Sequence, residues 1–226
     1  GYSLSEIGSD AFGIRLLIQS NKKILAVTST FIDGIYGIGL LRYTEDGRLD
    51  YNFGDDGVVI KSLGSLASLS ARGVGLQSDN KIVVLGNVSS GNTSDVYLYR
   101  YLVDGSPDHS FGTDGALLVS RSGWSSSAKG LVIQSDDKIV VTGSTSDRYG
   151  TNKIALWRFN SDGSLDQTFD GGNVNISLVP GEKNQYGADV AVQTNGGILV
   201  LGQVSKSNGD SGFAVLRFNE NGSLDS

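Results

Sequence analysis

The sequence of 226 residues contains no cysteine and no methionine, two prolines and one histidine. Without cysteine it forms neither a disulfide framework nor a cysteine-ligated zinc site, and thiolate catalysis is excluded. No apolar run has the length that a bilayer requires, so we expect no direct membrane insertion. The net charge of −6 argues against a nucleic-acid partner and against an anionic-membrane partner. Because no methionine or apolar leader begins the chain, we expect it to be part of a larger polypeptide or assembly.

Glycine is the residue that the sequence has in excess. The 32 glycines are about twice the usual share, and β-branched residues recur in short runs between them. This composition is typical of many short strands that are joined by tight turns.

A repeat of 57 to 59 residues organises the whole chain. The hairpin sequence "IQSDDKIVVTG" at residue 133 returns three times in recognisable form, and its glutamine recurs as Gln19, Gln77, Gln134 and Gln193. An arginine before an aromatic residue follows in each copy, as Arg42, Arg100, Arg158 and Arg217. Turns such as "SDGSLDQTF" come next. We place the repeats at approximately 11–68, 69–126, 127–184, and 185–226 together with 1–10, within one domain spanning 1–226.

Each copy has the pattern of four strands. In the third copy we expect strands at 129–134, 138–144, 153–159 and 174–178, because apolar residues alternate or run continuously there. Repeated four-stranded antiparallel units predict an all-β fold, a β-propeller of four-stranded blades. Tyr2–Glu6 stands where a fourth strand would precede the first copy, so we expect it to complete the last blade and to close a ring of four blades. An arc of a larger propeller and an oligomeric ring remain the alternatives.

The combined motif, with "QSDxKIVV" followed by "DGSLDxxFGxDG", resembles the delta-sixty repeat family of bacterial propeller repeats. The resemblance covers essentially the whole chain. It implies a propeller in a secreted or surface-exposed protein, and it brings no catalytic residue and no cofactor.

Comparison of the four copies separates repeated turns from variable turns. The turns between first and second strands and between third and fourth strands are repeated, whereas the other two differ in every copy. Alternating strand direction places the variable turns on one face, and binding sites in scaffolded folds generally lie on such loops. We therefore predict a ligand-binding surface that draws on aromatic and cationic residues of this face: Trp124, Tyr186, Tyr149, Arg148, Tyr36, Phe31, Arg72 and Lys129.

Several repeated or charged residues could carry other chemistry, but each also has a simple structural role. The repeated arginines could bind anions, but we expect each to pair with the repeated aspartate of its own copy: Asp50, Asp108, Asp166 and Asp225. The Asp-rich turns could hold calcium, but Asp-Gly turns explain the same residues, so we expect no metal. His109 lacks partners for catalysis. Loop carboxylates leave open a glycosidase or lyase.

The sequence thus favours a non-enzymatic recognition propeller, extracellular or on the cell surface, that binds a protein or a glycan and belongs to an adhesin or a similar assembly. A carbohydrate-active enzyme and a structural spacer are the alternatives.

Overall fold

The computed structural model describes residues 3–65, 67–91, 93–119, 125–147, 149–176 and 184–225, with the backbone alone for 172–176. These residues form antiparallel strands and one short 3-10 helix, η1 (Asp170–Gly172). Within these ranges, no helix has the length and apolarity to cross a membrane. The prediction of an all-β fold is confirmed.

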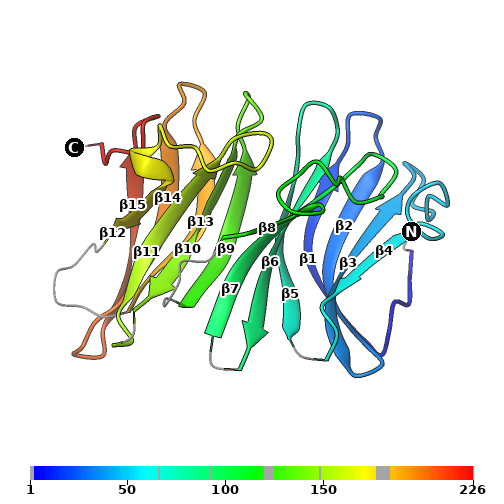
Figure 1. Cartoon of the computed structure of the whole chain (residues 1–226), viewed down its shortest axis with the longest axis horizontal. Coiled ribbons are helices and arrows are strands. Elements are labelled where there is room, and N and C mark those ends of the chain that lie inside the picture. Colours follow the sequence, from blue (N-terminus) through cyan, green and yellow to red (C-terminus); the bar gives the residue numbers. More distant parts are fainter. Residues whose placement is uncertain are drawn as a thin grey trace. The chain divides into compact units, whose positions relative to one another are not determined.

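The strands, which Figure 1 labels in chain order, form four blades. The first blade contains β1 (Asp10–Ile18), β2 (Ile24–Ile32), β3 (Ile35–Tyr43) and β4 (Val58–Ser62). The second contains β5 (Ser68–Leu76), β6 (Ile82–Ser90), β7 (Thr93–Tyr101) and β8 (Ala116–Leu118). The third contains β9 (Ser125–Ile133), β10 (Ile139–Ser146), β11 (Asn152–Phe159) and β12 (Asn173–Ile176). The fourth contains β13 (Asn184–Val192), β14 (Ile198–Ser205) and β15 (Ser211–Phe218). The strands predicted for the third copy match within a few residues, and Ser177 and Leu178 lie outside the described residues.

Two compact units divide the chain. Residues 1–118 contain the first and second blades, and residues 119–226 contain the third and fourth. In the second unit one parallel pair, Asn152 with Asn184, joins β11 to β13, so that the two blades share one seven-stranded sheet. Each unit is described by itself.

The turn between the first two strands of each blade explains why the hairpin sequence repeats. The third residue after the glutamine has a positive φ in every copy: Lys22 (65°), Asn80 (64°), Asp137 (64°) and Gly196 (82°). The glutamine N–H donates to the backbone carbonyl of the residue four positions later, as Gln19 does to Lys23 at 2.8 Å. In the fourth copy, "TNGG", Gly196 adopts the positive φ without steric cost, and Gln193 N–H donates to the Gly197 carbonyl at 2.8 Å. The turn is therefore kept, although Gly197 replaces the lysine of the other copies.

The core lies between neighbouring blades. In the first unit, Leu25, Val27, Ile38 and Leu40 of the first blade belong to the same buried cluster as Leu69, Ala71 and Val74 of the second. In the second unit, Val140, Ile154 and Leu156 of the third blade cluster with Val190, Ile198 and Val200 of the fourth. Apolar side chains on facing blades therefore supply the main stabilisation.

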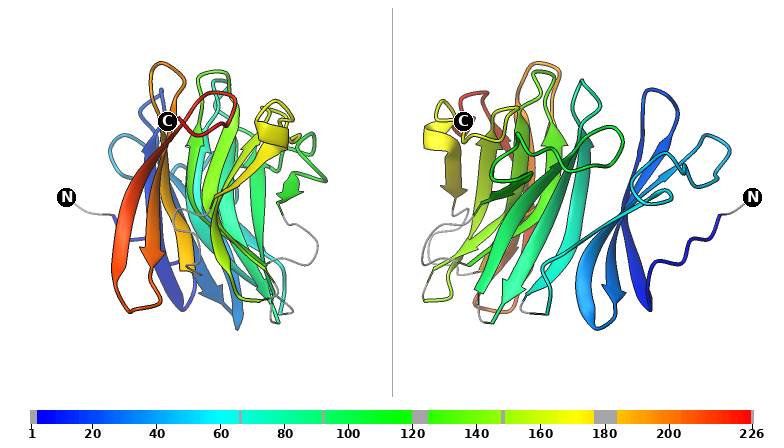
Figure 2. Two further views of the ribbon diagram at one scale, coloured as in Figure 1. Left: turned by 90° about the vertical axis from the view of Figure 1, so that its left-hand side faces the viewer. Right: turned by 45° about the vertical axis from the view of Figure 1, so that its right-hand side comes forward.

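The predicted ring closure by the N-terminal segment is wrong for the residues that the structure describes. Residues 3–6 form no strand, and the sheet of the fourth blade ends at β15 within the described ranges. Tyr2 lies outside them. The segment instead contacts the first blade: Tyr43 Oη donates to Ser5 Oγ at 2.9 Å, and Ser9 N–H donates to the Phe31 carbonyl at 3.0 Å. These contacts hold the segment beside β2 and β3, where Figure 2 (right panel) shows it in dark blue.

Candidate functional site

An arginine, an aspartate and a phenylalanine form one cluster in each of the first three blades. The arginine Nε donates to the aspartate Oδ2 at 2.6–2.8 Å, in the pairs Arg42–Asp50, Arg100–Asp108 and Arg158–Asp166. The guanidinium lies 4.4–4.5 Å from the ring centre of the phenylalanine eleven positions later, which is Phe53, Phe111 or Phe169. The predicted pairing is confirmed. Each of these arginines therefore has a structural role, because its charge is paired with the aspartate and its guanidinium lies over the phenylalanine ring.

The cluster changes the acidity of its carboxylates. Burial would raise the pKa of Asp166, but hydrogen bonds from Thr168 and the charge of Arg158 outweigh it and lower the pKa to about 2. Burial would also raise the pKa of Asp108. Hydrogen bonds from Ser110 and the charge of Arg100 outweigh this effect, and the pKa of Asp108 is lowered to about 2. Both carboxylates therefore remain ionised at neutral pH.

The aspartates of the repeated turns serve the backbone. Asp162 accepts from the Ser164 N–H at 2.8 Å, and Asp104 accepts from the Ser106 N–H at 2.9 Å. In the ranges that the structure covers, no three His, Asp or Glu side chains gather as metal ligands would. His109 is exposed in its turn and contacts Asp114 through Nδ1. These contacts account for the Asp-rich turns as turn-forming sequences.

The structure brings only part of the predicted binding surface together. Phe31 and Tyr36 form a cross-strand pair with ring centres 4.5 Å apart, and Tyr36 is exposed. Tyr149 is exposed in the turn after β10, and Tyr186 Oη bonds Asn152 Nδ2 at 3.2 Å. Trp124 and Arg148 lie outside the described residues. Because the first two residues and the next two belong to different units, the structure defines no common surface for them.

The two remaining cations share a feature that the sequence did not reveal. A β-bulge interrupts the first strand of every blade at the same repeat position, which is occupied by Ile14, Arg72, Lys129 and Ala188. A bulge re-aims the side chain of its extra residue. Lys129 is exposed, whereas Arg72 is half-buried and its buried Nε has no hydrogen-bond partner.

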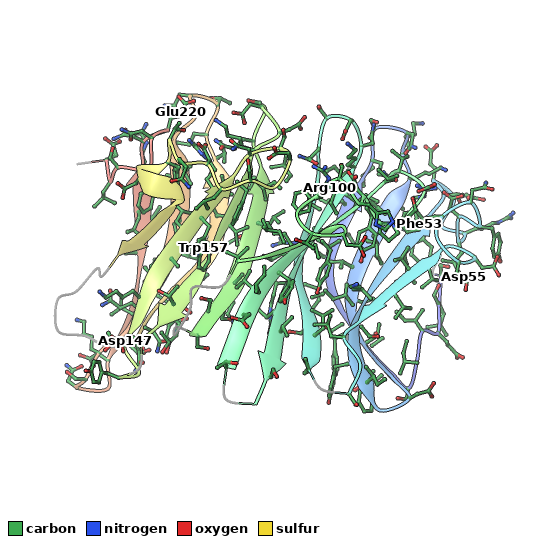
Figure 3. All side chains as sticks on the ribbon, in the orientation of Figure 1. Phe53, Asp55, Arg100, Asp147, Trp157 and Glu220 are labelled. Carbon is green, nitrogen blue, oxygen red and sulfur yellow. The ribbon has the colours of Figure 1, made fainter. Side chains whose placement is uncertain are left out.

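Docking of one blade on the next uses the same atoms in both units. Arg42 Nη1 donates to the Val103 carbonyl of the second blade. Arg158 Nη1 donates to the Glu220 carbonyl of the fourth blade at 2.6 Å, and Figure 3 labels Glu220 in the turn after β15. Val103 and Glu220 each stand three positions after the arginine of their own copy. A blade therefore binds the turn of its successor at a fixed repeat position.

Glycines of the same turns pack on the preceding blade. A Cβ at Gly105 would lie 2.9 Å from the Phe53 ring, and one at Gly222 would lie 3.0 Å from the Phe169 ring. At the first strand, the Ala71 N–H of the second blade donates to Ser29 Oγ of the first at 3.0 Å. The successor blade thus needs a glycine in its turn, because any side chain there would meet the buried phenylalanine.

Within the described residues, no blade covers the corresponding face of the fourth blade. Val215 corresponds to Leu40 of the first blade and Leu156 of the third; it is 66% exposed, whereas each of these is 1% exposed. Phe213 is 82% exposed, and its counterpart Ile38 is 2% exposed. Leu201 and Phe213 line an apolar hollow of about 540 Å³ together with Ala188, Gly202, Gln203, Ser211 and Gly212. We call the surface formed by Leu199, Leu201, Phe213, Val215 and Arg217 the open face.

The ion pair of the fourth blade is also more exposed to solvent than the equivalent pair of the third blade. Arg217 Nη1 donates to Asp225 Oδ2 at 2.5 Å, and its Nε donates to Gln193 Oε1 at 2.9 Å. The two charged side chains are 46% and 32% exposed, compared with 3% and 4% for Arg158 and Asp166. The contact between arginine and aspartate is kept in the fourth blade, but solvent covers it where another blade covers the pair of the third blade.

A known protein family has the same repeat. The family model described as "Domain of unknown function (DUF5122) beta-propeller" matches four segments of the chain: 19–53, 77–111, 134–169 and 193–226. The chain belongs to this beta-propeller family. The match bears out the predicted propeller repeat, but it does not carry the name delta-sixty. No curated protein matches the chain.

Several solved structures resemble this DUF5122 chain, and the Hadza microbial sialidase Hz136 is one of them. The TM-score is 0.60 at 13% sequence identity, and the match covers 92% of this chain and 44% of the sialidase chain. At this identity the likeness concerns the fold.

The sialidase likeness corrects the prediction of a non-enzymatic recognition propeller. That prediction is wrong, because a solved propeller to which this chain is similar is an enzyme, a sialidase. The fold therefore gives no ground for the recognition function that the variable turns suggested. The predicted extracellular location and the predicted lack of enzyme activity stay predictions.

Proposed function

We propose that this chain is a propeller-building module, whose open face binds a further blade of the same repeat. The observation that carries this proposal is the contrast between equivalent positions. Leu40 and Leu156 lie under a successor blade, while Val215 offers an apolar side chain of the same kind to solvent.

The chemistry of the open face supports a blade as its ligand. It combines an apolar centre with Arg217, the residue whose counterparts donate to a carbonyl of the successor blade. An apolar surface with one directional donor at its rim fits a sheet face with a carbonyl at its own rim. Burial of Phe213 and Val215 would remove two large side chains from water, which favours docking by about 1.5–3 kcal/mol for each fully buried side chain.

The solved chain that resembles this one is longer than it. The match covers 44% of the sialidase chain, so more than half of that chain lies outside the match. The earlier expectation that the chain works within a larger assembly becomes part of this proposal.

Hydroxyl-radical labelling followed by mass spectrometry tests the proposal. If a blade docks on the open face, Phe213 should be labelled several-fold more slowly than Tyr149, although the two are 82% and 72% exposed in the isolated chain. Tyr149 is the matched control, because it is an exposed aromatic residue in the turn after β10, outside the repeated turns that docking uses. Equal labelling of both residues at all protein concentrations would contradict the proposal.

A further inference from the structure

We infer that the blade which binds the open face is the first blade of a second copy of this chain, so that two copies associate head to tail. This inference rests on the proposed function and names the partner of the same surface.

The first blade carries the complementary half of the contact. Leu16 on β1 corresponds to Val74 and Val190, which are 5% and 8% exposed where they pack against a preceding blade. Leu16 itself is 66% exposed, and Ile18 beside it on the same strand is 74% exposed. One chain therefore exposes both of the surfaces through which the two blades of each unit contact each other.

The repeated turn of the first blade, which contains Gly47, is also uncovered. Gly47 corresponds to Gly105 and Gly222, but a Cβ at Gly47 would have nothing within 4 Å. Glu45 stands three positions after Arg42, as Val103 and Glu220 stand after their arginines. We therefore expect Arg217 to donate to the Glu45 carbonyl of the second copy, as Arg158 does to Glu220.

The contact joins two different surfaces of the chain, so it is heterologous and stays finite only if it closes into a ring. A head-to-tail contact that closes after two copies gives such a ring. Closure within one chain would use the same two surfaces, and the experiment below distinguishes it from the association of two copies.

Two variants that each damage one half of the contact test the inference. Val215→Asp places a charge on the open face, and Leu16→Asp places one on the first blade. Each residue is exposed within its own chain, so both variants should fold as the wild-type chain does. Alone, each variant should sediment as single chains, because burying an unpaired charge weakens the contact at least about tenfold.

Mixing the two variants should restore association. The intact open face of Leu16→Asp fits the intact first blade of Val215→Asp, so an equimolar mixture should form a 1:1 complex with one contact. Leu118→Asp, which changes an exposed apolar residue on β8 of the second blade, outside both surfaces, should associate as the wild-type chain does.

Other outcomes overturn the inference in distinguishable ways. If wild type and mixture both remain single chains while Phe213 is protected from labelling, the chain closes on itself, and the inference fails while the proposed function stands. If Phe213 is labelled as fast as Tyr149, the proposed function fails with it. Association that survives both substitutions would place the contact elsewhere and would also refute the inference.

Discussion

Removing the charge of one aspartate should have very different costs in the third and fourth blades. Asp166 and Asp225 occupy equivalent positions, and each accepts a hydrogen bond from the arginine of its own blade. We compare Asp166→Asn with Asp225→Asn, because asparagine keeps the size of the side chain and removes only its charge. The two substitutions lie in one unit, so they differ mainly in the cover that the successor blade provides.

The magnitude follows from burial. Arg158 and Asp166 are 3% and 4% exposed, and breaking a buried ion pair costs about 3–5 kcal/mol, because a buried charge loses its partner. Arg217 and Asp225 are 46% and 32% exposed, and an exposed pair contributes about 0–1 kcal/mol. At about 2–4 °C per kcal/mol for a chain of this length, Asp166→Asn should lower Tm by about 6–20 °C and Asp225→Asn by less than about 4 °C.

Urea unfolding provides the assay. Circular dichroism follows the strands, and tryptophan fluorescence, to which Trp157 buried beside Arg158 on β11 contributes, follows the second unit, which contains both tryptophans. The protein is kept dilute, so that single chains are compared. Equal losses of stability, or a larger loss for Asp225→Asn, would refute the reasoning that the covering blade determines the value of the ion pair.

Two more predictions follow from the same contacts. Because the pKa of Asp108 and of Asp166 is lowered to about 2 from an ordinary 3.8, stability is fully present above about pH 4 and should fall by about 2 kcal/mol per carboxylate as pH drops toward 2. A urea series between pH 2 and pH 5 measures this fall, and an unchanged midpoint across that range would contradict it. A Cβ at Gly187 would lie 2.3 Å from Thr142 Oγ1 of the third blade, whereas one at Gly212 on β15 has nothing within 4 Å. Gly187→Ala should therefore cost about 1–3 kcal/mol and Gly212→Ala much less, and equal costs in urea unfolding would show that the blade contact is not tight there.

The architecture was predictable because four copies of one blade share a chain. The phase of the glutamines and arginines gave the strands, and the buried pairing of Arg158 with Asp166 followed from the cost of an unpaired buried charge. The four bulges were not predictable, since Ile14, Arg72, Lys129 and Ala188 share no chemistry that marks the position.

The open face could not be found by residue type. Leu201 and Val215 are apolar, as are Val27 and Leu40, which are 1% exposed. The exposure of a blade face depends on whether another blade follows it, and a repeat pattern does not contain that information. The predicted role of the N-terminal segment failed for a related reason. Position in the repeat suggested a strand for the last blade, while Ser5 and Ser9 form their hydrogen bonds with the first.

The most direct test of the head-to-tail account is the mass of the unmodified chain in solution, measured by sedimentation equilibrium over a dilution series. The account predicts a species of two chains, twice the 23.8 kDa of one, that dissociates to single chains on dilution. A constant mass of one chain at every concentration would contradict it.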